Sequence, residues 1–138
     1  MKIYVASSWR NERQPEVVAL LRELGHAVFD FRSPHGRTGF HWSHIDPKWQ
    51  SWSSNRFRAF LNHPLARGGL TQDYEAMRAC EAVVLVMPCG RSSHLELGWF
   101  IGRDRPSYIL LCDGEPELMY GLATKLCTSL EELREEFE

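Results

Sequence analysis

The chain has 138 residues, of which 43% are hydrophobic and 25% are charged, and its formal net charge is −2. These proportions are typical of a globular domain, and the length is sufficient for one domain with its own buried core. A slightly acidic chain argues against a general nucleic-acid or membrane surface, because such surfaces need an excess of Lys and Arg. No apolar run approaches the roughly 18 residues of a membrane span.

The cysteines indicate a reducing environment. There are four of them, far apart in the sequence and without a CxxC pair: Cys80, Cys89, Cys112 and Cys127. We expect reduced thiols rather than disulfides or a zinc site, and therefore a cytoplasmic location. The opening MKIYVASSWR passes directly into a strand pattern and lacks the anatomy of a signal peptide.

The N-terminal part of the chain predicts a strand, a helix and a second strand. Residues 2–6 have the apolar composition of a buried strand, and residues 27–31 form the second strand. Between them a helix is expected over 14–24, with Pro15 in its first turn and Gly25 as its stop. Strand, helix and strand at this spacing make parallel neighbours with a right-handed crossover.

Residues 32–70 interrupt this regular pattern. The segment holds three of the five tryptophans and four of the six histidines. One helix is expected in it, with Asp46 as N-cap and Pro47 at N1, ending before Pro64. Two interpretations stay open, a helix that covers one face of the sheet and a lid or pocket wall, and one segment can do both.

Regular elements return after Gly68 and Gly69. We expect helices over 71–80 with Thr71 as cap, over 94–102 opening at Ser92 or Ser93, and over 129–138 with Ser129 as cap, and strands over 82–87, 106–112 and 125–127. Five strands separated by helices predict a single α/β domain over residues 1–138, with 32–70 as an insertion. The expected fold is a doubly wound, flavodoxin-like or Rossmann-like parallel sheet with strand order 2-1-3-4-5.

Polar side chains gather where such a sheet binds ligands, beyond the carboxyl ends of its first and third strands. The candidates are Tyr4 in the first strand, Ser7, Ser8, Trp9 and Arg10 after it, Gly90, Arg91, Ser92 and Ser93 after the third strand, Glu96 in the next helix, and Asp73 in the first turn of the 71–80 helix. Each has a purely structural alternative. Ser93 and Glu96 have capping-box spacing, Asp73 can serve the helix dipole, and the serines can be turn or cap residues.

The segments KIYVASSWR, LTQDYEAMRACEAVVLVM and SSHLELGWFIG, followed by the strand YILLC, resemble the nucleoside 2-deoxyribosyltransferase family, including its nucleotide 5′-monophosphate N-glycosidase branch. The resemblance covers the first strand and nearly everything from residue 68 on, and skips residues 32–66. It implies that Glu96 is the nucleophile, that Asp73 acts near the leaving base and that Tyr4 positions the nucleophile. Ser8 and Arg10 would bind a 5′-phosphate, and Trp9, Gly90, Ser92 and Ser93 would complete the substrate site. Ser92 replaces a residue that is often glycine, and Gly90 stands where some transferases carry an acidic residue, which leaves deoxyribose specificity open.

The expected activity is cleavage or transfer at the N-glycosidic bond of a nucleoside or nucleoside 5′-monophosphate. A carboxylate beside the anomeric carbon can attack it, and a second carboxyl can donate a proton to the departing base. Hydroxyl groups, a helix N-terminus and an arginine suit an anion, and Trp42, Trp49 or Trp52 can stack on a base. We expect no cofactor and no metal, and the resemblance implies a homodimer or a higher homo-oligomer.

Three alternatives remain open. The first is a TIR-like NAD glycohydrolase, which also uses a glutamate at a ribosyl carbon. The second is a nucleotide-binding sensor that does not catalyse a reaction. The third is a metal site built from the residues His35, His41, His44, His63 and Asp46.

Overall fold

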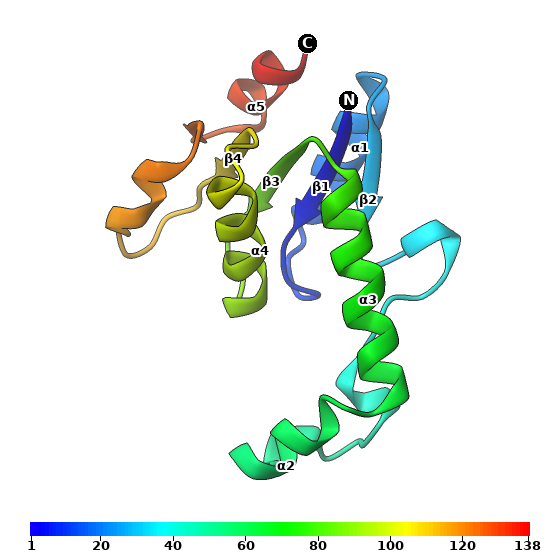
Figure 1. The fold of residues 1–138 in the computed structure, drawn as a ribbon. Coiled ribbons are helices and arrows are strands. Elements are labelled where there is room, and N and C mark those ends of the chain that lie inside the picture. Colours follow the sequence, from blue (N-terminus) through cyan, green and yellow to red (C-terminus); the bar gives the residue numbers. More distant parts are fainter.

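The computed structural model describes residues 1–138 and has a five-stranded sheet at its centre (Figure 1). Its strands are β1 (Lys2–Ala6), β2 (Ala27–Asp30), β3 (Ala82–Val86), β4 (Ser107–Leu110) and β5 (Lys125–Cys127). All neighbouring strands pair in parallel and the order is β2-β1-β3-β4-β5. The α/β class and the strand order expected from the sequence are therefore confirmed.

Helices cover both faces of the sheet, and the side chains of β1 alternate between the two resulting cores. Ile3 and Val5 pack toward α1 (Gln14–Glu23) and α5 (Leu130–Phe137). Tyr4 and Ala6 pack on the opposite face, toward α3 (Pro64–Ala79) and α4 (Arg91–Gly102). None of the helices combines the length and apolar character that crossing a bilayer requires.

The ends of α1 and α5 follow the expected local rules. Pro15 lies in the first turn of α1, and Gly25 after its end has a φ of 90°, in the left-handed region that favours glycine. The Ser129 hydroxyl oxygen accepts a hydrogen bond from the backbone N–H of Glu132 and so caps α5.

The expected helix capped by Asp46 is wrong. A short 3₁₀ turn (Trp49–Ser51) comes first, and α2 (Ser54–Phe60) begins after Ser53, whose hydroxyl oxygen accepts from the Arg56 N–H. The Asp46 carboxylate accepts from the Lys48 N–H and from the indole N–H of Trp52 instead. Its hydrogen bonds are therefore made within a turn, which is the common alternative to capping for an aspartate.

The helix expected over 71–80 also begins much earlier. α3 runs without interruption from Pro64 to Ala79, with the His63 ring accepting from the Leu65 N–H, so Thr71 caps nothing. Gly68 and Gly69 lie inside this helix rather than before it. A Cβ at Gly69 would stand 2.9 Å from Cβ of Phe40, so this glycine allows the preceding segment to pack closely against α3.

Residues 41–65, which we call the arm, project beyond the sheet at the N-terminal end of α3 (Figure 1). No residue of the arm is buried or belongs to either core. Its aromatic side chains contact one another: the ring centroids of Trp42 and Trp52 lie 5.6 Å apart, and those of Trp52 and Phe60 lie 4.5 Å apart. The arm therefore does not cover a face of the sheet.

Candidate active site

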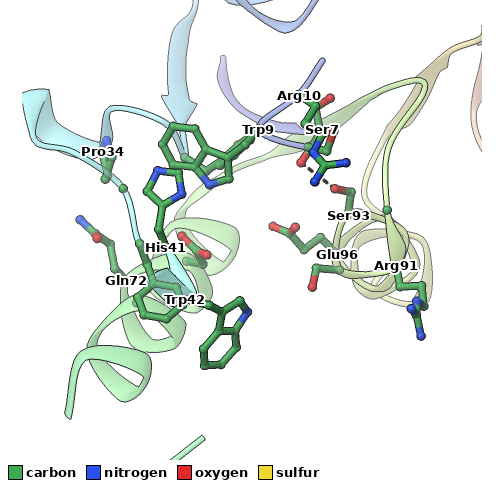
Figure 2. Close-up of a pocket in the computed structure, with 18 of the residues that line it drawn as sticks. Ser7, Trp9, Arg10, Pro34, His41, Trp42, Gln72, Arg91, Ser93 and Glu96 are labelled. Carbon is green, nitrogen blue, oxygen red and sulfur yellow. Dashed lines mark hydrogen bonds between the residues drawn. The ribbon is translucent and has the colours of Figure 1, made fainter. Parts of the chain in front are cut away.

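A cavity of about 680 Å³ opens at the carboxyl ends of β1 and β3, where the strand order reverses. Four parts of the chain line it: the loop after β1, the segment between residues 31 and 49, one turn of α3 and the start of α4 (Figure 2). This is the position at which open α/β sheets bind ligands. All of the candidate residues except Tyr4 line the cavity: Ser7, Ser8, Trp9, Arg10, Asp73, Gly90, Arg91, Ser92, Ser93 and Glu96.

Tyr4, in β1, does not line the cavity but contacts Glu96, which does. Its ring is fully buried and stacks on Phe29, with centroids 5.1 Å apart. Its hydroxyl donates a hydrogen bond to Oε2 of Glu96. Because the ring is fixed within the core, the hydroxyl fixes the orientation of the Glu96 carboxylate.

Glu96 is not part of a capping box, so that structural explanation is wrong. α4 begins at Arg91 with Gly90 as N-cap, which places Glu96 in the second turn rather than the first. The Ser93 hydroxyl does not cap the helix either, since it donates to the carbonyl oxygen of Ser7 at 2.8 Å. With no side chain capping α4, its first backbone N–H groups remain without partners beside the cavity.

The second carboxyl group of the cavity, that of Asp73, lies in the third turn of α3. The expectation that it lies in a first turn is wrong, because α3 starts seven residues before Thr71. The effect of the helix dipole falls off within the first turn, so the dipole does not account for this aspartate. Asp73 reaches the predicted edge because α3 extends past the ends of the strands (Figure 1).

Burial raises the pKa values of both carboxyl groups. Burial raises the pKa of Glu96 to about 7; the hydrogen bond from Tyr4 opposes this rise, and the charge of Asp73 adds to it. Burial raises the pKa of Asp73 to about 6. Burial and the charge of Glu96 hold the pKa of the Tyr4 hydroxyl far above its usual value, so the phenol stays protonated. Near neutral pH the two carboxyl groups can therefore hold one proton between them.

The loop after β1 is held by hydrogen bonds to its backbone. Nη2 of Arg32 lies 2.9 Å from the carbonyl oxygen of Ser8, 2.8 Å from that of Trp9 and 2.6 Å from that of Asn11. The Asn11 amide donates to the carbonyl oxygens of Val86 and Pro88 at the end of β3. These hydrogen bonds connect the loop after β1 to Arg32, which follows β2, and to the end of β3.

Two arginines stand at the rim of the cavity. Arg10 and Arg91 are exposed, and their guanidinium groups make no hydrogen bond or ion pair with the rest of the chain. Figure 2 shows Arg10 above Ser93 and Arg91 at the start of α4. Both charges are available to an anion near the α4 N-terminus.

Aromatic side chains form the wall that faces Glu96 (Figure 2). The ring of His41 packs on that of Trp9, with centroids 3.9 Å apart, and Trp42 and Trp49 extend the wall. Burial, followed by the nearby His44, lowers the pKa of His41, which favours its neutral form. Trp52, the third tryptophan expected to stack on a base, does not line the cavity, because its ring packs on Trp42 and Phe60 inside the arm.

The residues of the metal-site alternative do not form one. No group of three or more His, Cys, Asp or Glu side chains in the structure could hold a metal ion. Both carboxylate oxygens of Asp46 already accept hydrogen bonds, from Lys48 and Trp52. His41 lines the cavity as part of the aromatic wall.

Sequence reasoning missed three residues in or beside this site, Arg32, His41 and Gln72. Arg32 follows the second strand directly, so applying the strand-end rule to all strands would have found it. His41 was considered only as a metal ligand. Gln72 also lines the cavity, on the His41 side (Figure 2), although it lay within the expected 71–80 helix beside Asp73.

Comparison with known proteins yields a likeness of fold. No protein-family model matches the chain, and no curated protein matches it. A 2-deoxyribosyltransferase of Bacillus psychrosaccharolyticus superposes with a TM-score of 0.67 and 18% identity, over 97% of this chain and 90% of that chain. The CMP N-glycosidase BcmB of Clostridium botulinum gives a TM-score of 0.54 and 15% identity, over 99% and 97% of the two chains. A conserved protein of Enterococcus faecalis gives 0.65 and 15%, over 99% and 96%.

Proposed function

We propose that this protein cleaves or transfers the N-glycosidic bond of a nucleoside or nucleoside 5′-monophosphate, with Glu96 as the nucleophile. The observation that carries the proposal is the Glu96 carboxylate, oriented by the buried Tyr4 hydroxyl and paired with Asp73 in one cavity. Folding alone requires neither a hydrogen bond from the buried Tyr4 to Glu96 nor two neighbouring carboxyl groups with raised pKa values. The fold likeness to a deoxyribosyltransferase and a CMP N-glycosidase agrees with the proposal.

The proposed reaction has two steps. The pKa of Glu96, about 7, is above that of Asp73, about 6, so the reactive form, with Glu96 ionised and the shared proton on Asp73, is the less populated one near neutral pH. In the first step, ionised Glu96 attacks the anomeric carbon, so that a carbon–oxygen bond forms as the carbon–nitrogen bond to the base breaks. Asp73 gives its proton to the departing base nitrogen. In the second step, water or the nitrogen of another base displaces Glu96 from the sugar, and a proton from that acceptor returns to Asp73. Tyr4 keeps the Glu96 carboxylate aligned throughout.

The shape of the cavity suggests how the substrate lies in it. A 5′-phosphate fits the side formed by Ser8, Arg10 and the unpartnered N–H groups of α4, with Arg91 nearby. The base then rests on the aromatic wall of Trp9 and His41, with the sugar above Glu96 between them. Gln72, the neighbour of Asp73, lies on that wall's side (Figure 2), consistent with proton donation to the base.

The test is a substrate panel. The protein is incubated with ribo- and deoxyribonucleosides, their 5′-monophosphates and NAD, and free base is measured by chromatography. We expect base release from a nucleoside or its monophosphate, and none with Glu96→Gln. Nicotinamide release from NAD as the main reaction would favour the NAD glycohydrolase alternative. Calorimetric binding of a nucleotide that is equal in wild type and Glu96→Gln, with no base released by either, would favour the sensor.

A further inference from the structure

The arm forms a cavity of its own, which we call the arm cavity, next to the candidate active site. Its volume is about 440 Å³, within the range of about 300–1,000 Å³ that is usual for small-ligand pockets. Seven residues of the arm and one of α4 line it: Trp42, Trp49, Gln50, Trp52, Ser53, Ser54, Phe57 and Arg91. Aromatic rings with a few polar groups among them are the usual lining of a ligand site.

The arm cavity and the candidate active site adjoin each other. Trp42, Trp49 and Arg91 line both of them. Figure 2 shows the side chains of Trp42 and Arg91 below Glu96 in its view. A ligand bound over Glu96 can therefore extend past these residues into the arm cavity.

The aromatic rings of the arm cavity have exposed area that a further ring could cover. Trp49 is 36% exposed and Phe57 is 43% exposed. The rings of Phe57 and Trp42 meet edge to face, with centroids 5.7 Å apart, so the faces of one of the two rings are left uncovered by the other. Nucleobases stack on such faces, and because every base has a π-face this contact does not depend on which base is present.

Polar groups of the arm cavity have no partner within the chain. The carboxamide of Gln50 and the hydroxyl of Ser54 are exposed and make no hydrogen bond to another residue. No acidic residue lines the arm cavity, and the guanidinium group of Arg91 has no ion-pair partner. These groups suit a ring with a hydrogen-bonding edge that is attached through an anionic linker.

We propose that the substrate is a dinucleotide in which a 5′,5′-diphosphate joins two nucleosides, and that the arm cavity binds the nucleoside that does not react. This inference rests on the proposed function, because the reacting nucleoside takes the sugar and base positions described above. Its own phosphate lies near Arg10, and the second phosphate lies near Arg91, on the way to the arm. The second base stacks on Trp49 or Phe57, and Gln50 hydrogen-bonds to its edge.

Two separate arginines favour a diphosphate over a single phosphate. Arg10 and Arg91 are both exposed, and neither is paired with a carboxylate. Arg10 borders the candidate active site alone, whereas Arg91 borders both cavities. A single phosphate beside one of them leaves the other unused, whereas each phosphate of a diphosphate can pair with one arginine.

The experiment compares substrates that contain the same reacting nucleoside. Symmetric dinucleoside 5′,5′-diphosphates of adenosine, cytidine, guanosine and uridine, and their 2′-deoxy forms, are compared with the corresponding 5′-monophosphates, and free base is measured by chromatography. We expect kcat/KM to be about tenfold or more higher for the dinucleotide, which is the gain usual for the stacking of one base. Phe57→Ala should lower kcat/KM for the dinucleotide about tenfold more than kcat/KM for the monophosphate.

Leu61→Ala is the matched control, because Leu61 is 40% exposed, follows Phe57 by four residues and lines neither cavity. It should leave the ratio of the two kcat/KM values as in the wild type. Gln50→Ala tests the arm cavity without removing an aromatic contact, and it should lower the preference for the dinucleotide about threefold. Melting curves establish that each variant is folded.

The outcomes separate this inference from the proposed function. Base release from monophosphates without a preference for dinucleotides overturns the inference and leaves the proposed function standing, as does a preference that neither Phe57→Ala nor Gln50→Ala reduces. Faster cleavage of a dinucleoside monophosphate linked 3′ to 5′ also overturns it and assigns the arm cavity to the end of a nucleic-acid strand. The absence of base release from all of these substrates would refute the proposed function, and this inference with it.

Discussion

Replacing Glu96 by Gln should remove activity and should also make the stability of the folded protein depend less on pH between about 4.5 and 7. The folded state raises the pKa of this carboxyl group from 4.5 to about 7, so between these values it binds the proton more tightly than the unfolded chain does. Stability therefore falls as pH rises through that window. The rise in pKa corresponds to about 3 kcal/mol of unfolding free energy lost by pH 8. Gln keeps an oxygen that can accept from Tyr4 and has no charge to bury.

The measurement is urea denaturation of wild type and Glu96→Gln at a series of pH values from 4 to 8. The wild type should lose about 3 kcal/mol more than the variant across the series, and the variant should be the more stable of the two at pH 8. If Glu96 only supports its helix, the wild type should instead be more stable than Glu96→Gln at pH 8. Parallel stability curves for the two proteins would show that the carboxylate is not held at a raised pKa, and would refute the reasoning.

Three further predictions concern neighbouring residues. Asp73→Asn should slow release of natural bases, which need a proton, and should matter much less for an analogue whose nitrophenolate leaves as a stable anion; equal slowing of both would assign Asp73 a positioning role. Arg10→Ala should raise the KM for a nucleoside 5′-monophosphate far more than for the nucleoside, whereas Arg37→Ala, an exposed arginine outside the cavity lining, should change neither. Arg32→Ala should lower the unfolding free energy by about 2 kcal/mol in urea denaturation and should also weaken nucleotide binding, because the carbonyl groups of the loop after β1 lose their shared donor. Lowered stability of Arg32→Ala with unchanged KM would mean that the loop keeps its shape without this arginine.

The sheet could be predicted from the sequence because its signals are local. Each strand is a short apolar run, and the intervening helices have the periodicity and end signals that fix their extent. The segment around residues 46–71 could not be predicted in this way. Asp46 and the pair Gly68–Gly69 look like a helix start and a helix boundary, yet Asp46 bonds the Trp52 indole and Gly69 packs on Phe40. Those partners are contacts formed by folding, and spacing along the chain does not reveal them.

The candidate site lies at the predicted edge of the sheet, but Asp73 reaches this edge for a structural reason other than the expected one. The edge rule brought Glu96 and the loop after β1 together correctly, since parallel strands share one carboxyl edge. Asp73 reaches that edge through the length of α3, although it was placed there as part of a helix start. The spacing of Ser93 and Glu96 fits a capping box and a nucleophile equally well. The capping box is excluded by features that the spacing does not reveal: α4 begins at Arg91, and the Ser93 hydroxyl donates to Ser7. The hydrogen bond to Glu96 comes from Tyr4, ninety-two residues away in sequence.

Gly68 and Gly69 make the stability of α3 differ between its two halves. Each costs about 1 kcal/mol relative to alanine in a helix interior, and a Cβ at Gly68 would meet nothing within 4 Å, so no close packing requires glycine there. The N-terminal half of α3 has one buried residue, Ala66, which belongs to neither core, whereas the C-terminal half is anchored in the core through Met77. The backbone amides before Gly68 should exchange with deuterium well ahead of those after Asp73, so that the arm and the sheet open as separate cooperative units. Because Asp73 lies one turn beyond Gly69, it stands at the boundary between these two units.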